Sequence, residues 1–206
     1  MDMAGSLLKH RIITLDTPIS AETANPVITQ MLLLDAEDSV EPIELYINSP
    51  GGSVLDGLAI IDAMQCIQAP VSTICLGRAA SMAAWLLAAG TKGRRFAAPN
   101  AEVMIHGLSD GLFGEDGLDM RISPQVRTAG FRQTSPDQQI YQRRQEMWQK
   151  RLVAMLARWT GRNSRRIETD IRRDLFLSAQ EAKAYGIVDE ILEPFKEKTT
   201  GAEDPR

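Results

Sequence analysis

The pattern of apolar and polar positions divides the first half of the chain into alternating strands and helices. Residues 11–15, 43–48 and 71–76 are short apolar runs bounded by turn residues, as buried strands are. Residues 54–67 instead carry apolar side chains at helical spacing. A repeated order of strand, turn and helix predicts an α/β fold with parallel strands, and we expect one domain over residues 1–194.

The helix that precedes the second strand has two possible starts. Ser20 is one candidate for the N-cap, but Asn25 followed by Pro26 is the cleaner signal, because proline suits the first helical position. The buried face of this helix is then expected to consist of Ile28, Met31, Leu32 and Leu34.

The second half of the chain contains a polar segment at 107–134 that is too long for an ordinary connection between elements. A long amphipathic helix from Ser135 to Thr160 follows it. Its expected apolar side consists of Ile140, Tyr141, Trp148, Leu152, Met155, Leu156 and Trp159. The remaining expected elements are a helix from Ser164, a strand near 175–177, a helix opened by a capping box from Ser178 to Glu181, a strand at 187–192 and a disordered tail at 195–206.

Composition excludes several classes of function. The 23 Lys and Arg against 27 Asp and Glu give a net charge of −4, which argues against a general nucleic-acid binder. No apolar run approaches the roughly 20 residues of a membrane helix, so we expect a cytoplasmic protein without nucleic-acid or membrane partners. Cys66 and Cys75 lie in segments patterned as buried, which predicts reduced core thiols. Because His10 and His106 are the only histidines, we predict no metal site and no cofactor.

Candidate chemistry is found at three places along the chain. Ser81 lies at a strand-to-helix junction between alanines, which leave room for a substrate chain. Gly51 and Gly52 follow a strand and can turn backbone N–H groups toward an oxyanion. His106 closes a short apolar strand and could act as a general base. These parts predict a serine hydrolase, and the alternatives are a serine that only caps a helix and a histidine that only completes a strand.

The carboxylate that would orient the histidine is not fixed by spacing, because the members of a catalytic triad meet in space. The candidates are Asp110, Asp137, Asp170, Asp174 and Asp189. The surroundings of Ser81 also lack the Gly-x-Ser-x-Gly pattern, which lowers the case for an α/β-hydrolase.

Trp148 and Trp159 on the long helix fit either a core or an oligomer surface. Residues 143–173 contain ten Lys and Arg against three Asp and Glu. We interpret this excess as solvated helix faces and ion pairs between subunits, not as a nucleic-acid patch.

Four motifs resemble one family, the proteolytic subunit of the ATP-dependent Clp proteases (ClpP). They are LYINSPGG, STICLGRAASMAAWLLAAG, PNAEVMIH and RRDLFLSAQEAKAYGIVDEIL, and the similarity runs from about residue 7 to residue 192. The resemblance implies Ser81 as nucleophile, His106 as base and Asp174 as acid. It also implies an oxyanion hole made by the backbone N–H groups of Gly52 and Met82, and it places Arg173 in a contact between rings.

The same resemblance implies an α/β, ClpP/crotonase-like fold with a protruding handle helix, the segment at 107–134 being an enlarged handle loop. It further implies a serine endopeptidase for peptides and unfolded proteins, a homo-oligomer built as a heptamer or tetradecamer, and an AAA+ unfoldase as partner. Two other functions are considered: a weakly active structural or regulatory ring subunit paired with a catalytic paralogue, and a crotonase-type acyl-CoA enzyme. The last is disfavoured, because its chemistry does not need Ser81 and His106.

Overall fold

The computed structural model describes residues 3–108 and 136–193. Its helices are α1 (Met3–Leu8), α2 (Ala21–Glu37), α3 (Val54–Cys66), α4 (Met82–Ala89), α6 (Pro136–Thr160), α7 (Ser164–Asp170) and α8 (Ala179–Tyr185). Its strands are β1 (Ile12–Leu15), β2 (Ile43–Ser49), β3 (Val71–Ala80), β4 (Arg95–Ala97), β5 (Glu102–Ile105), β6 (Leu175–Ser178) and β7 (Glu190–Ile191). The predicted loop at 107–134, except its first two residues, and the predicted tail at 195–206 lie outside the described residues.

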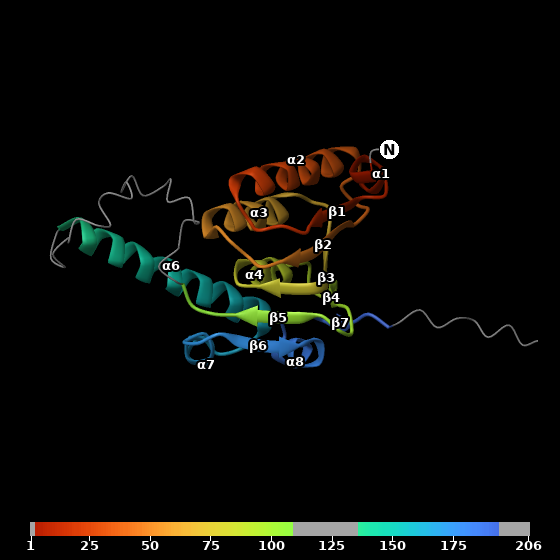
Figure 1. Ribbon diagram of the computed structural model, residues 1–206. Coiled ribbons are helices and arrows are strands. Elements are labelled where there is room, and N and C mark those ends of the chain that lie inside the picture. The colour runs from red at the N-terminus through yellow and green to blue at the C-terminus, as the bar shows by residue number, and fades with distance from the viewer. Residues whose placement is uncertain (1–2, 109–135, 194–206) are drawn as a thin grey trace, which may run out of the picture.

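Five strands form a parallel sheet in the order β1-β2-β3-β4-β7. β5 pairs in parallel with the second half of β3, and β6 runs antiparallel beside β5 (Figure 1). β3 is longer than the predicted strand at 71–76, because it pairs first with β2 and β4 and then, from Arg78 onward, with β5. The predicted α/β fold with parallel strands is confirmed.

The core lies between this sheet and the helices α2, α3 and α4, which pack against one another in chain order (Figure 1). Their core-facing apolar residues and those of the strands are almost completely buried, among them Ile13, Met31, Leu45, Ile61, Cys75, Leu86 and Val103. Burial of this apolar surface is the main contribution that stabilises the sheet, because parallel strands need cover on their faces. Pairing within the sheet in turn sets the position in space at which each strand ends.

The start predicted for α2 is wrong. The helix begins at Ala21 with Ser20 as N-cap, and a capping box links Ser20 with Thr23. Pro26 lies inside the helix, where it costs one hydrogen bond near the first turns. The buried face consists of Ala24, Val27, Met31 and Leu34, whereas Leu32, which was predicted on it, is exposed.

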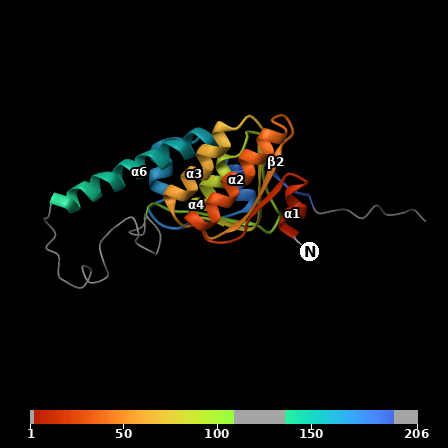
Figure 2. The ribbon, with the colours of Figure 1, turned by 90° about the horizontal axis from the view of Figure 1, so that it is seen from above.

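Helix α6 begins at Pro136 and ends at Thr160, as predicted within one residue. Its N-terminal half extends past the rest of the domain in both views (Figures 1 and 2). Ile140 in that half is 61% exposed, so the predicted apolar side of this helix is not buried along its whole length. Trp148 and Trp159 lie further along and pack, partly buried, against the core of the same chain. The C-terminal half of α6 therefore belongs to the core.

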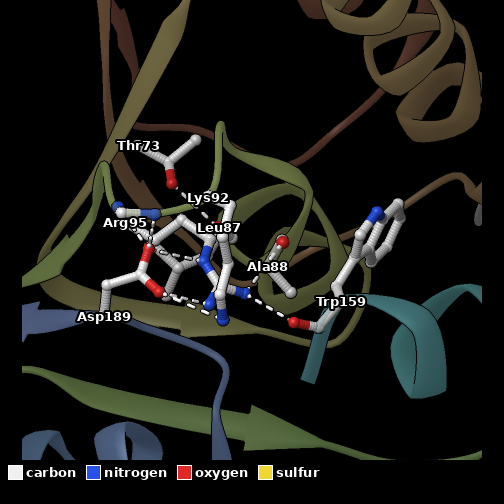
Figure 3. Close-up of polar contacts among 8 residues, drawn as sticks. Thr73, Leu87, Ala88, Lys92, Arg95, Trp159 and Asp189 are labelled. Atoms are coloured by element: carbon white, nitrogen blue, oxygen red, sulfur yellow. Dashed lines mark hydrogen bonds and ion pairs between the residues drawn. The ribbon is translucent and has the colours of Figure 1, made fainter. Parts of the chain in front are cut away.

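Arg95 is buried to 1% exposure, and its charge is matched by Asp189 (Figure 3). Its Nε donates to Asp189 Oδ2 at 2.8 Å, and its Nη1 donates to the carbonyls of Ala88 at 3.3 Å and Trp159 at 3.1 Å. A buried guanidinium needs such partners, because an unpaired charge in the interior is costly. The cluster joins β4, α4, the end of α6 and the residue before β7.

The two cysteines differ in environment. Cys75 is buried in β3, as predicted, but Cys66 is exposed at the last residue of α3, so that prediction is wrong. The helix pattern did not show where the buried face stops near its C-terminus. Both cysteines are free thiols.

Candidate active site

Ser81 occupies the sharp turn between β3 and α4. Its φ of 54° and ψ of −130° lie in a region that residues with a Cβ rarely adopt, at a cost of about 1–3 kcal/mol. Its backbone N–H is held by the carbonyl of Met104 on β5 at 2.8 Å. Although Ser81 has the N-cap position of α4, its side chain makes no capping hydrogen bond. The interpretation of Ser81 as a simple cap does not fit this geometry.

The Ser81 hydroxyl instead meets His106, which follows the last residue of β5. His106 Nε2 lies 2.8 Å from Ser81 Oγ, the distance of a hydrogen bond. In the tautomer protonated at Nδ1, the hydroxyl donates to Nε2, which is the arrangement of a nucleophile with its general base. The imidazole is partly buried, with 24% of its side chain exposed.

Among the candidate acids, Asp174 is the described carboxylate beside His106. Its Oδ1 lies 3.8 Å from His106 Nδ1, which is an ion-pair distance but no hydrogen bond. Asp170 is engaged by Arg166 and Tyr185, and Asp189 is engaged by Arg95. The side chains of Asp110 and Asp137 lie outside the described part of the chain.

The turn after β2 presents Gly51 and Gly52 to Ser81. The N–H of Gly51 donates to Ser49 Oγ at 3.2 Å, and Ile19 exchanges backbone hydrogen bonds with the residues on either side of Gly52. In such a parallel bridge the N–H of Gly52 itself points away from Ile19. Gly52 is therefore the better candidate of the two glycines for an oxyanion donor.

Both glycines are required by close approach. A Cβ on Gly51 would lie 2.7 Å from Ser81 Cβ and 2.9 Å from the Met82 backbone nitrogen. A Cβ on Gly52 would lie 2.3 Å from the carbonyl oxygen of Ile19. The Met82 N–H belongs to the first turn of α4, where backbone donors have no partner within the helix. Gly52 and Met82 both line the cavity that contains Ser81.

A small cavity of about 40 Å³ opens beside these groups. It is lined by Gly52, Val54, Ser81, Met82, Trp85, His106, Gly107, Leu108 and Leu152. A larger cavity of about 190 Å³ lies between α1, β1 and α2, away from Ser81, and has no such pair of reactive groups in its lining. We therefore place the candidate site at the smaller cavity, because chemistry and not volume identifies it.

Several contacts of the site were not singled out from the sequence. Ser49 is completely buried and donates to the carbonyl of Thr17 at 2.6 Å while accepting from Gly51. Trp85 donates its indole N–H to the carbonyl of Leu152 at 3.1 Å. A polar residue at the end of an apolar strand was the available signal for Ser49. Nothing in the sequence pairs Trp85 with a residue of α6.

Among residues 3–108 and 136–193, no cluster of three or more His, Cys, Asp or Glu side chains is arranged to hold a metal ion. Within the same part of the chain, no helix has both the length and the hydropathy that crossing a membrane requires. The described Arg173 is exposed next to Asp174.

A strained serine between a parallel strand and a helix, with a histidine at hydrogen-bond distance and glycine N–H groups nearby, is an arrangement typical of serine hydrolases. Comparison with protein-family models matches the sequence to Clp protease over residues 1–126 and again over 120–195. The chain belongs to the Clp protease family, a family of peptidases whose members form oligomeric rings.

Proposed function

We propose that the protein is a self-compartmentalising serine endopeptidase that cleaves peptides and unfolded proteins through an acyl-enzyme. One observation carries the proposal: the Ser81 hydroxyl lies 2.8 Å from His106 Nε2 and does not cap the helix that it precedes. A strained backbone at a residue whose side chain does not cap its helix is typical of a residue placed for chemistry.

In this mechanism Ser81 Oγ attacks the scissile carbonyl and its proton passes to His106 Nε2. The N–H groups of Gly52 and Met82 stabilise the oxyanion of the tetrahedral intermediate. The imidazolium then protonates the leaving amine, so the C–N bond breaks and an ester to Ser81 remains. Water activated by the same imidazole hydrolyses the ester and restores the serine. Asp174 stabilises the imidazolium through its charge.

The proposal extends to assembly. Helix α6 projects from the domain and exposes Ile140 and Met147, and Arg173 lies exposed beside the proposed triad. Projecting apolar and basic side chains fit a contact between rings, in which the helix acts as a handle. Heptamers or tetradecamers would enclose the sites, and an AAA+ unfoldase would supply unfolded chains to them. Sedimentation that gives only monomer at micromolar concentration would contradict the assembly.

A fluorophosphonate probe tests the chemistry directly, because it reacts with an activated serine. We expect one adduct per chain, mapped by mass spectrometry to Ser81. Ser81→Ala should abolish both the adduct and peptide hydrolysis, whereas Ser178→Ala, which alters a helix cap, should keep both. An adduct elsewhere, or hydrolysis that survives Ser81→Ala in a clean preparation, would overturn the assignment.

One distance favours a second function. In that function the protein is a weakly active structural or regulatory ring subunit beside a catalytic paralogue. The 3.8 Å gap between His106 and Asp174 leaves the imidazole without a hydrogen bond to an orienting carboxylate. The same probe distinguishes the two functions. A subunit of the second kind would be labelled slowly alone and would gain little hydrolysis on assembly.

A further inference from the structure

One turn of α6 contacts both halves of the candidate site. Gln149 Oε1 accepts a hydrogen bond from the backbone N–H of Leu108 at 2.8 Å, two residues after His106. The carbonyl of Leu152 in the same turn accepts from the Trp85 indole at 3.1 Å, and Trp85 belongs to the helix that follows Ser81. The turn at 149–152 therefore spans the segments that carry the base and the nucleophile.

The backbone that follows His106 is held from two sides. The Gly107 N–H donates to the carbonyl of Ile171 at 2.7 Å, and the Leu108 N–H donates to Gln149. A Cβ on Gly107 would lie 3.1 Å from Ile171 O and 3.5 Å from Gln149 Nε2. The two partners thus fit closely around residue 107. Because β5 ends at Ile105, hydrogen bonds of the sheet no longer fix residues 107 and 108. The Ile171 carbonyl and Gln149 Oε1 accept from their N–H groups instead.

We propose that Gln149 is a positioning residue for His106. By accepting the Leu108 N–H, it fixes the backbone just beyond the histidine and so keeps Nε2 at 2.8 Å from Ser81 Oγ. The glutamine side chain is long enough to reach the Leu108 N–H and offers an uncharged carbonyl oxygen as the acceptor. The inference rests on the proposed function for its effect on catalysis.

The activity test compares substitutions that differ in one hydrogen bond. Gln149→Leu removes the acceptor and should lower kcat about threefold to tenfold with little change in KM, as loss of one partly buried hydrogen bond predicts. Gln149→Glu keeps an acceptor and should retain most of kcat. Gln145→Leu, the same substitution one turn earlier in α6, is the matched control and should leave kcat unchanged. A fall in kcat for Gln145→Leu as large as for Gln149→Leu would overturn the proposal.

The donor can be removed as well. Leu108→Pro has no N–H, whereas Leu108→Ala shortens the side chain and keeps it. Leu108→Pro combined with Gln149→Leu should be no slower than the slower single variant, since both remove the same bond. Effects that multiply instead would show that the two residues act separately and would contradict the proposal.

A readout that needs no activity is the reaction of histidines with diethyl pyrocarbonate, followed by mass spectrometry. His10 is exposed and serves as the internal reference for His106. Gln149→Leu should raise the His106 to His10 reaction ratio several-fold, because the ring is released from Ser81, and Gln149→Glu should not. If Ser81 takes no fluorophosphonate in the parent, the proposed function fails, yet this ratio still decides the role of Gln149. An unchanged ratio in Gln149→Leu, with an unchanged melting temperature, would overturn that role.

Discussion

His106 Nδ1 and Asp174 Oδ1 lie 3.8 Å apart, near enough for the carboxylate to attract a protonated imidazole and too far for a hydrogen bond. Asp174 is 60% exposed, so water screens much of that attraction. The imidazole is thus oriented mainly by Ser81 on its other nitrogen and by the backbone that follows it.

Asp174→Asn should lower kcat at least tenfold and leave KM nearly unchanged, because the amide cannot stabilise the imidazolium that forms in the transition state. Steady-state hydrolysis of a short peptide measures both constants. Asp62→Asn, which neutralises an exposed carboxylate on α3, is the control and should keep parental rates. Parental rates in Asp174→Asn would mean that another carboxylate stabilises the histidine.

Gly51→Ala should reduce kcat/KM about 100-fold or more, because its Cβ would lie 2.5 Å from the Ala80 carbonyl and displace the turn that faces Ser81. Gly161 is the matched control. It has a similar positive φ of 75°, but a Cβ there meets nothing within 4 Å. Gly161→Ala should cost about 1 kcal/mol of stability and no activity. Equal losses in kcat/KM would show that backbone strain alone explains the effect.

Acid should destabilise the protein through Asp189. Burial alone would raise the pKa of this carboxyl, but the hydrogen bonds and charge of Arg95 outweigh burial and lower the pKa to about 2. Because the folded pKa lies below the ordinary 3.8, the stabilisation is present above pH 3.8 and is lost as pH falls toward 2. Asp189→Asn should remove that pH dependence of the free energy of unfolding.

At neutral pH, Asp189→Asn should also lower the free energy of unfolding by about 3–5 kcal/mol, because it leaves Arg95 buried without a counter-charge. Lys92, whose side chain is 77% exposed, lies 3.4 Å from the same carboxylate and provides the control. Lys92→Ala should change stability by less than about 1 kcal/mol. Urea unfolding at a series of pH values measures both variants, and similar losses for the two would contradict this account.

Alkylation should distinguish the two cysteines. Burial raises the pKa of the Cys75 thiol to about 12, whereas Cys66 is exposed. Iodoacetamide on the native protein should modify Cys66 alone, because the thiolate is the reactive form and Cys75 does not form it. Mass spectrometry after digestion reads the sites. Cys66→Ser should take up no label until the protein unfolds, and early labelling of Cys75 would show that β3 opens.

Local sequence signals were enough for much of the fold. The capping box from Ser178 to Glu181 and the apolar run at 71–76 each depend on neighbours in the chain, and both were predicted. The start of α2 was not, because a proline signal competed with a capping box made by Ser20 and Thr23 instead of the usual acidic partner. β4 has three residues, one of them the buried Arg95, and so carries no apolar pattern.

The site residues likewise fall into those that the sequence predicted and those that it did not. Ser81 and His106 stand out because their surroundings restrict them, one by small neighbours and the other by being the single histidine at a strand end. The choice among the aspartates needed the three-dimensional structure, since Asp189 pairs with Arg95, 94 positions away, and Asp170 is engaged by both Arg166 and Tyr185. The contact from Gln149 to Leu108 spans 41 positions and joins an ordinary polar residue to a backbone N–H. Neither member has a sequence signal.

The backbone bridge between Ile19 and Gly52 links the turn after β2 to the segment that follows β1. Ile19 follows the edge strand β1, and Gly52 follows β2, so the position of Gly52, the proposed oxyanion donor, depends on the segment that packs at the margin of the sheet. A chain in which β1 has separated from the sheet keeps Ser81 and His106 but no longer holds the Gly52 N–H in a fixed orientation. The proposed hydrolysis would then require the complete sheet, because without β1 in place the turn at Gly52 has no backbone partner in Ile19.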